Sequence, residues 1–242
     1  MRVPRLFCAS IRPGEVALPP EEAHHAGEVL RLSHGDPVLL FDGCGVEADA
    51  TVVEANRRRM TVRVLDVRQR AFELPVSLTL AVALPKGPRQ LVLVEKCTEL
   101  GVATILPMIT HRSVVKPSGI EKLKRRAIEA CKQSGRAFVP NIEKALTMTD
   151  VLAVVSNFAI ALIASPDESS PTLSRVLTEL TGSTVAPPIP LLVLIGPEGG
   201  WEPFEIDRAT SADCRRVSLG PHILRTETAA IAACASVAQF TK

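Results

Sequence analysis

Apolar stretches of strand length alternate with helical patterns over the last two thirds of the chain. The strand-length stretches are 77–84, 104–109, 158–164 and 191–195. The residues between them predict helices over 88–100, 119–134 and 172–180. The first of these helices begins with Pro88 and stops before Gly101, which are typical residues for the two ends of a helix. Strands that alternate with helices indicate a parallel sheet, so we expect an α/β domain here.

Residues 1–73 show a different pattern, with shorter strands separated by turn residues. The expected helix and strands occupy 21–32, 38–41, 47–54 and 60–67. Their lengths suit a compact barrel. The pattern changes around Phe72 to Pro75, where we place a boundary between a small, mostly β domain at 1–73 and the α/β domain at 74–242.

Two expected strands end in glycine. The strand 191–195 runs directly into Gly196-Pro197-Glu198-Gly199-Gly200, and a second strand, 217–220, ends at Gly220 before a loop and a small-residue helix from Arg225. Glycine gives a strand exit backbone freedom and lets a ligand approach closely, and ligands of open α/β sheets bind outside the carboxyl ends of the strands. The two exits therefore predict a pocket. A tight strand-to-helix turn without a ligand is the alternative.

Composition narrows the class of protein. The chain has 242 residues, 46% of them hydrophobic, and no apolar stretch approaches the roughly 20 residues that a membrane helix needs. No signal-peptide core follows Arg2 and Arg5, so we expect a cytoplasmic protein. The six cysteines are scattered singly, which favours buried apolar side chains over a disulfide or a metal site.

The net charge of +2 is distributed unevenly. Over 74–150, 12 Lys and Arg stand against 6 Asp and Glu, whereas acidic residues are in slight excess on either side. Such an excess suits phosphate binding, and a solvated helix face is the commoner cause. The basic turn at Arg57, Arg58 and Arg59 has the same two explanations, because it falls at an expected hairpin tip.

Several short motifs, each weak alone, form an ordered set along the chain. They are His24-His25, Val29–Arg31, Lys86-Gly87, Glu95–Gly101, Arg112-Ser113, Glu129–Ser134 with Arg136, Ile195–Gly200 and Leu219–Ala229. Together they resemble the knotted SPOUT class of S-adenosylmethionine methyltransferases. More narrowly, they resemble the family that methylates N3 of a uridine in bacterial 16S ribosomal RNA. The resemblance covers nearly the whole chain.

The resemblance implies a PUA-like RNA-binding barrel followed by an α/β methyltransferase domain with a trefoil knot that holds the cofactor. It also implies a homodimer, with 16S ribosomal RNA or the small ribosomal subunit as partner, and no metal or membrane. The residues expected to bind S-adenosylmethionine are Leu162, Ile163, Ile195, Gly196, Pro197, Glu198, Gly199, Gly200, Leu219, Gly220, Ile223 and Leu224. Trp201 is expected to act as an aromatic lid.

The chemistry of the glycine loop agrees with that cofactor. The loop lacks the G-x-G-x-x-G spacing of a dinucleotide site and the Gly-Lys-Ser/Thr of a P-loop. Glu198 would repel a phosphate-rich ligand, whereas a carboxylate tolerates a nearby sulfonium.

Arg225 and Glu198 are the candidate catalytic residues. Uracil N3 carries a proton, so its methylation needs a base or a group that stabilises the developing anion. We expect Arg225 to hold the uracil oxygens; a phosphate anchor or an ion pair with Glu227 or Glu198 is the alternative. The residues that match family positions facing the RNA are His25, Arg31, Lys86, Arg112, Gln133 and Arg136.

Three other functions stay open. One is a knotted methyltransferase with another RNA target, such as a ribose 2′-oxygen or a pseudouridine; the order of the motifs and the N-terminal domain argue against it. The second is a non-catalytic RNA-binding protein of ribosome assembly. The third and weakest is a small-molecule methyltransferase.

Overall fold

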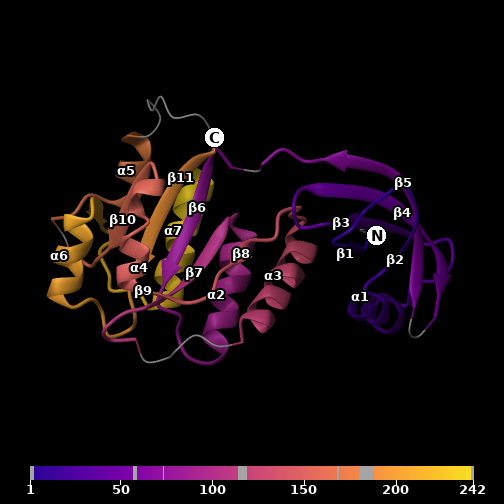
Figure 1. The fold of residues 1–242 in the computed structure, drawn as a ribbon, viewed down its shortest axis with the longest axis horizontal. Helices are drawn as coiled ribbons and strands as arrows, with labels where there is room; N and C mark the ends of the chain where they lie inside the picture. Colours follow the sequence, from indigo (N-terminus) through magenta and orange to yellow (C-terminus); the bar gives the residue numbers. More distant parts are fainter. Residues whose placement is uncertain are drawn as a thin grey trace. The chain divides into compact units, whose positions relative to one another are not determined.

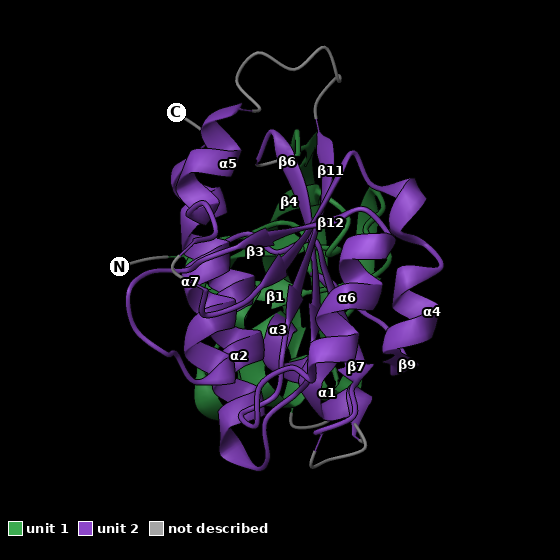
Figure 2. Cartoon of the chain, turned by 90° about the vertical axis from the view of Figure 1, so that its left-hand side faces the viewer, with its two compact units in different colours: residues 1–73, 128–139 green, residues 74–127, 140–242 purple. Residues whose placement is uncertain are grey.

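The computed structural model describes residues 3–56, 59–72, 74–113, 119–167, 169–179 and 188–240. The chain divides into two compact units, coloured separately in Figure 2. Unit 1 holds 1–73 and 128–139, and unit 2 holds 74–127 and 140–242. The units therefore differ from the predicted domains in grouping 128–139 with the N-terminal residues, and those domains stay a prediction.

Unit 1 is built on a five-stranded sheet. Its strands are β1 (Arg5–Phe7), β2 (Gly14–Ala17), β3 (Pro37–Phe41), β4 (Val46–Ala55) and β5 (Met60–Gln69), in the order β1-β3-β4-β5-β2. β1 pairs with β3 in parallel, and the other neighbours are antiparallel. The three strands predicted from the sequence are confirmed with slightly longer bounds, whereas β1 and β2 were not predicted.

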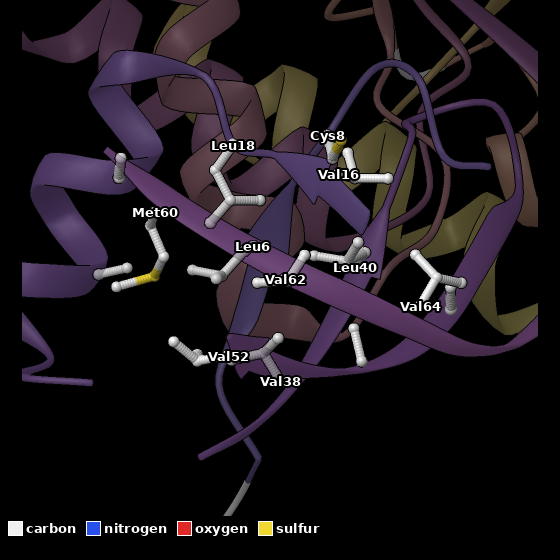
Figure 3. Packing of buried hydrophobic residues seen from close by; sticks show 14 residues of the cluster. Leu6, Cys8, Val16, Leu18, Val38, Leu40, Val52, Met60, Val62 and Val64 are labelled. Atoms are coloured by element: carbon white, nitrogen blue, oxygen red, sulfur yellow. The ribbon is translucent and has the colours of Figure 1, made fainter. Parts of the chain in front are cut away.

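The core of unit 1 lies on one face of this sheet. Alternate residues point inward, as Ala48, Ala50 and Val52 of β4 do, because successive side chains of a strand face opposite sides. Figure 3 shows Leu6, Leu40 and Val62 packed together in this cluster. The alternation of the sequence therefore fixes which face is buried.

The predicted helix over 21–32 is shorter and less regular than expected. An α-helix, α1 (Pro20–His24), passes into one π-helical turn, η1 (His25–Val29), and the chain then turns at Arg31, whose φ is +56°. A positive φ is uncommon for a residue with a side chain, so Arg31 marks the end of the helix. Arg57 and Arg58 of the basic turn lie outside the described residues.

Residues 128–139 join unit 1 through polar contacts with its N-terminal part. Nζ of Lys132 lies 2.5 Å from Oε1 of the buried Glu22, and Oε2 of Glu22 accepts a hydrogen bond from the backbone of Phe7. The carbonyl of Arg136 accepts a hydrogen bond of 2.9 Å from Arg5. These contacts make the second half of the helix α3 (Ile120–Ser134) part of unit 1.

Unit 2 contains the parallel sheet that the sequence predicts. Its strands are β6 (Val76–Val82), β7 (Thr104–Ile109), β8 (Asn141–Ile142), β9 (Leu146–Thr147), β10 (Ile160–Ala164), β11 (Ile189–Ile195) and β12 (Cys214–Val217). Six strands follow the order β12-β10-β11-β6-β7-β8, β9 pairs with β7, and all pairs are parallel. The strand predicted at 217–220 was wrong: it ends at Val217, because Ser218 turns the backbone towards Gly220.

Helices cover both faces of this sheet (Figures 1 and 2). They are α2 (Pro88–Glu99), α4 (Met148–Leu152), a 3₁₀ turn η2 (Val155–Asn157), α5 (Leu173–Glu179), α6 (Pro203–Ser211) and α7 (Thr226–Gln239). α2, α5 and α7 lie on one face and α4 and α6 on the other, where Met148, Val151 and Ala209 share a core with Ile163 and Leu194. The predicted helices over 88–100, 119–134 and 172–180 are confirmed within their described residues; α4 and α6 were not predicted.

The described residues contain neither of two features that would change the class of protein. None of their helices combines the length and apolarity that spanning a membrane requires. Within the same ranges, no three His, Cys, Asp or Glu side chains gather where they could hold a metal ion. All six cysteines are free, and five of them are buried, Cys44 being the exposed one.

Candidate functional site

Three neighbouring strands of unit 2 end side by side. β10 lies between β11 and β12, with Ile163 paired to Leu194 and Ala164 paired to Val217. Because the strands are parallel, their carboxyl ends lie at one edge of the sheet, where an open α/β sheet binds its ligand. The loops that leave them come together around one pocket.

The pocket is lined by all three loops and by the start of α7. Its lining residues are Ala164, Ser165, Pro166, Ile195, Gly196, Pro197, Glu198, Gly200, Trp201, Leu219, Gly220, His222, Ile223, Leu224, Thr226 and Ala229. Most of the predicted cofactor residues are among them. The exceptions are Gly199, next to lining residues, and Leu162 and Ile163, which are fully buried inside β10. From β10 it is the following Ala164–Pro166 segment that lines the pocket.

Trp201 ties the glycine loop to the end of β10. Its indole Nε1 donates a hydrogen bond of 2.8 Å to the carbonyl of Ala164. The ring packs against Gly196, where a Cβ would lie 2.9 Å from Cε2 of the ring. Trp201 therefore lines the pocket as a brace between two loops, and Gly196 has no side chain because the indole occupies that space.

Thr226 ties the third loop to the same glycine. Its buried hydroxyl donates a hydrogen bond of 3.0 Å to the carbonyl of Gly196. Since Thr226 is the first residue of α7, this bond fixes the start of the helix beside the glycine loop. Gly196 is thus the point at which all three loops are joined.

Two other glycines give the pocket its backbone-lined wall. Gly200 has a φ of +73° and Gly220 a φ of +132°, conformations that favour glycine. A Cβ at either position would meet nothing within 4 Å, so both backbones face open space. A ligand can therefore approach the main chain closely at these two positions.

Glu198 is held at the pocket by an arginine that sequence reasoning missed. Arg89, in the first turn of α2, places its Nη2 3.1 Å from Oε1 of Glu198 and its Nη1 3.8 Å from Oε1 of Glu227. The side chain of Glu198 is 32% exposed, whereas that of Glu227 is only 12% exposed. One guanidinium therefore serves two carboxylates, and the pair between Glu198 and Arg225 weighed from the sequence is not seen.

Arg225 lies in the chain between the lining residues Leu224 and Thr226 and does not itself line the pocket. It is exposed and caps α7 with an extended backbone conformation. Within the described ranges its guanidinium forms no hydrogen bond or ion pair. The neighbouring Ile223 is 87% exposed, so the third loop presents both a free cation and an apolar side chain to solvent.

Arg112 holds the outer side of the glycine loop. Its Nη1 donates a hydrogen bond of 2.7 Å to the carbonyl of Gly199, and its Nε donates one of 2.8 Å to Glu202. This hydrogen bond from Arg112 holds the pKa of Glu202 below its usual value. Arg112, predicted to contact RNA, therefore also orders the loop that lines the pocket.

The other residues predicted to contact RNA are divided between the units. His25, Arg31, Gln133 and Arg136 belong to unit 1, whereas Lys86 belongs to unit 2. Arg31, Lys86 and Gln133 are exposed, and Arg136 is buried at 6% exposure. Their contacts with RNA stay a prediction.

Local signals existed for three of the residues that sequence reasoning missed. Arg89 follows Gly87-Pro88 in the first turn of a helix, where the helix dipole favours an acidic residue, so a basic residue there indicates nearby carboxylates. Ser165 and Pro166 follow directly on a buried parallel strand, the position of a ligand loop. No local signal marks the packing of Trp201 on Gly196, because the pattern of the sequence does not report on that contact.

Both parts of the chain match models of known domains. Residues 72–238 match an RNA methyltransferase domain, and residues 18–65 match an RNA methyltransferase PUA domain. Among curated proteins, the ribosomal RNA small subunit methyltransferase E of Synechocystis sp. is 34% identical over 225 residues, which cover 92% of this chain and 72% of the relative.

Solved structures match the whole chain. A protein from Legionella pneumophila in complex with bound S-adenosylmethionine has a TM-score of 0.87 and 33% identity, covering 99% of this chain and 98% of its own. The ribosomal RNA small subunit methyltransferase E from Neisseria gonorrhoeae, bound to S-adenosylmethionine, has a TM-score of 0.86 and 30% identity, covering 97% and 96%. The similarity therefore extends over both compact units.

Proposed function

Because this chain belongs to the RNA methyltransferase family that contains the bacterial ribosomal RNA small subunit methyltransferases E, we propose that it methylates N3 of a uridine in 16S ribosomal RNA with S-adenosylmethionine. The fold expected of such a protein is confirmed in its two parts. They are a PUA-like β unit and an α/β unit with a parallel sheet, of the SPOUT type. The trefoil knot stays a prediction.

The observation that carries the proposal is the pocket at the carboxyl ends of β10, β11 and β12. Three loops enclose it, and their backbones are joined at Gly196 by Trp201 and Thr226. A pocket fixed from three sides is preorganised, so little ordering is needed when a ligand binds.

The residues present fit S-adenosylmethionine. Gly200 and Gly220 leave open space at the main chain for a flat adenine edge, and Ile195 and Leu224 supply apolar surface. The carboxylate of Glu198 suits the positive charge of a sulfonium and disfavours a phosphate-bearing cofactor. When bound, the cofactor supplies an electrophilic methyl group on that sulfonium.

Arg225 is proposed to stabilise the uracil as its N3 proton leaves. Loss of this proton spreads negative charge over N3 and the two carbonyl oxygens, so an exposed guanidinium beside the pocket lowers the barrier. The N-terminus of α7 lies at the same place and adds a partial positive charge. The rest of the catalysis is positioning of the two reactants by the loops.

The proposed partner is 16S ribosomal RNA, presented as naked RNA or as the small ribosomal subunit. The PUA-like unit and the basic segment 74–150 would bind it through phosphates, so affinity should fall steeply with salt. We further propose a homodimer, and a cytoplasmic enzyme, because ribosomal RNA is made there in bacteria.

The test is transfer of labelled methyl from S-adenosylmethionine to small ribosomal subunits that lack the modification, followed by identification of the product nucleoside. Appearance of 3-methyluridine at one site is the expected result. Label in a ribose, a pseudouridine or a small molecule would overturn the uridine-N3 assignment. Binding of cofactor and RNA without transfer would favour a non-catalytic role in ribosome assembly.

A further inference from the structure

We propose that Arg89 and Glu227 set the charge preference of the pocket by an exchange of partners. In the exchange, Arg89 leaves Glu198 and pairs fully with Glu227 when a cationic ligand binds beside Glu198. The inference rests on the proposed function in taking S-adenosylmethionine as that ligand. It assigns a specificity role to two residues, neither of which lines the pocket.

The two ion pairs of Arg89 are unequal. Nη2 of Arg89 lies within hydrogen-bond distance of Glu198, at 3.1 Å, whereas Nη1 stays 3.8 Å from Glu227, beyond that distance. The pair with Glu198 is also the more exposed, so water screens it more. Arg89 therefore pairs closely with Glu198, which a ligand in the pocket can reach, and pairs only loosely with the more buried Glu227.

The carboxylate of Glu227 has one oxygen whose hydrogen bonding is incomplete. Its Oε2 is buried and has no hydrogen-bond partner in the described parts of the chain. A buried carboxylate oxygen without a partner is costly, and the cost is relieved when a donor arrives. Arg89 already places Nη1 3.8 Å from Oε1 of the same carboxylate, so a movement of its side chain towards Glu227 would supply the missing donor.

The position of Arg89 allows this movement at a low cost in free energy. It lies in the first turn of α2, where the helix dipole disfavours a positive charge and no acidic residue of that turn compensates it. Its attachment there depends on Glu198 and Glu227. The side chain of Arg89 is 41% exposed, so its guanidinium can turn between the two carboxylates without breaking a packed core.

The exchange would couple ligand charge to binding and release. When a methyl group is transferred, the S–CH₃ bond breaks with its electron pair staying on sulfur, an N3–CH₃ bond forms, the N3 proton passes to solvent water and the sulfonium becomes a neutral thioether. Glu198 then has no cationic ligand and takes Arg89 back. The neutral product S-adenosylhomocysteine is therefore bound less favourably than the cofactor.

The experiment measures dissociation constants for S-adenosylmethionine and for S-adenosylhomocysteine by calorimetry on the full-length protein. The readout is the ratio of the two constants, because loss of general structure weakens both ligands alike. Arg89→Met should increase the preference for the cationic S-adenosylmethionine over S-adenosylhomocysteine about tenfold. Glu227→Gln should decrease this preference about tenfold. Each change in the ratio of dissociation constants corresponds to about 1.4 kcal/mol.

A double-mutant cycle separates partner exchange from simple charge effects. In the Arg89→Met background, Glu227→Gln should change the ratio of dissociation constants little further, because no guanidinium remains for Glu227 to pair with. Charges acting independently would give additive shifts and would overturn the exchange. Arg215→Met and Glu179→Gln make the same charge changes at an exposed ion pair outside the pocket and should leave the ratio unchanged.

The remaining outcomes are decisive as well. An unchanged ratio in variants that bind both ligands would overturn this inference alone. A wild-type protein that binds neither ligand would overturn the proposed function and this inference with it. Arg89→Lys keeps the charge and serves as a second variant if Arg89→Met does not fold.

Discussion

Trp201 packs on Gly196 so closely that a Cβ at position 196 would lie 2.9 Å from the indole ring. Real Cβ atoms do not approach other atoms so closely, so any side chain here must displace the ring. Because the indole also donates to the carbonyl of Ala164, its displacement would separate the glycine loop from the end of β10. The pocket therefore depends on the absence of one methyl group.

Gly196→Ala tests this dependence. We expect the free energy of unfolding to fall by about 1–3 kcal/mol, the usual cost of overpacking, and S-adenosylmethionine to bind more weakly. Denaturant unfolding and calorimetry measure the two effects. Gly27→Ala is the matched control, because the nearest atom to its Cβ would lie at 3.9 Å. Equal stability of the two variants would contradict the brace.

Thr226→Val removes the bond between α7 and the glycine loop while keeping the shape of the side chain. The carbonyl of Gly196 loses the donor that the buried Thr226 supplies, so we expect a loss of about 1–3 kcal/mol in the free energy of unfolding. Thr226→Ser should retain the bond. The same change at the exposed Thr228 should cost less than about 0.5 kcal/mol, and a similar loss at both positions would contradict the assignment.

Arg225→Ala should reduce turnover and leave the cofactor in place. Removal of one group that stabilises a developing oxyanion lowers kcat about 10²–10³-fold, so we expect a loss of that size at saturating RNA. Affinity for S-adenosylmethionine should change little. Arg175→Ala, on the exposed surface of α5, is the control. Normal turnover of the Arg225 variant would eliminate the catalytic role.

Lys132→Met should destabilise unit 1 strongly. The pair of Lys132 with Glu22 is about nine-tenths buried on both sides, so removal of the cation leaves a buried carboxylate at a cost of about 3–5 kcal/mol. Lys124→Met, on the same helix, breaks an exposed pair with Glu121 and should cost at most about 1 kcal/mol. Denaturant unfolding compares the two, and equal losses would contradict the buried pair.

The buried thiol of Cys214 should make the free energy of unfolding decrease as the pH rises into the alkaline range. Burial raises its pKa from 9.0 to about 11, because the thiolate is poorly solvated at the start of β12. The unfolded chain therefore loses this proton first as the pH rises, and the stability contributed by the buried thiol declines between about pH 9 and pH 11. Cys214→Ala should flatten this part of the profile in thermal unfolding, whereas Cys44→Ala, at an exposed thiol, should not. Identical profiles for both would contradict the assignment.

The sequence predicted the parts of the fold that local patterns specify. The apolar run of β11 and the glycines after it predicted both a buried strand and a loop that lines a pocket, because strand burial and backbone freedom depend on residues adjacent in the sequence. The short strands β1 and β2 were not predicted, because three or four residues are too few to show a period of hydrophobic positions. Ser218 likewise ended β12 earlier than the apolar pattern suggested.

The site was predicted incompletely for a different reason. The glycine loops are visible in the sequence, whereas the ion pairs of Arg89 join residues more than a hundred positions apart. The assignment of Leu162 and Ile163 to the cofactor came from the strand rather than its exit. Sequence pattern located the strand end, and only the pairing of three strands shows that Ala164 to Pro166 faces the pocket.

Because residues 128–139 belong to unit 1, this unit cannot complete its folding early during synthesis of the chain. Synthesis proceeds from the N-terminus, so the strands β1 to β5 leave the ribosome before Lys132 and Arg136 have been made. Until the later helix has been made, Glu22 lacks its ion pair with Lys132, and Arg5 lacks the carbonyl of Arg136. The N-terminal unit therefore completes its folding only after part of the α/β unit has been made, an order opposite to the usual one for successive domains.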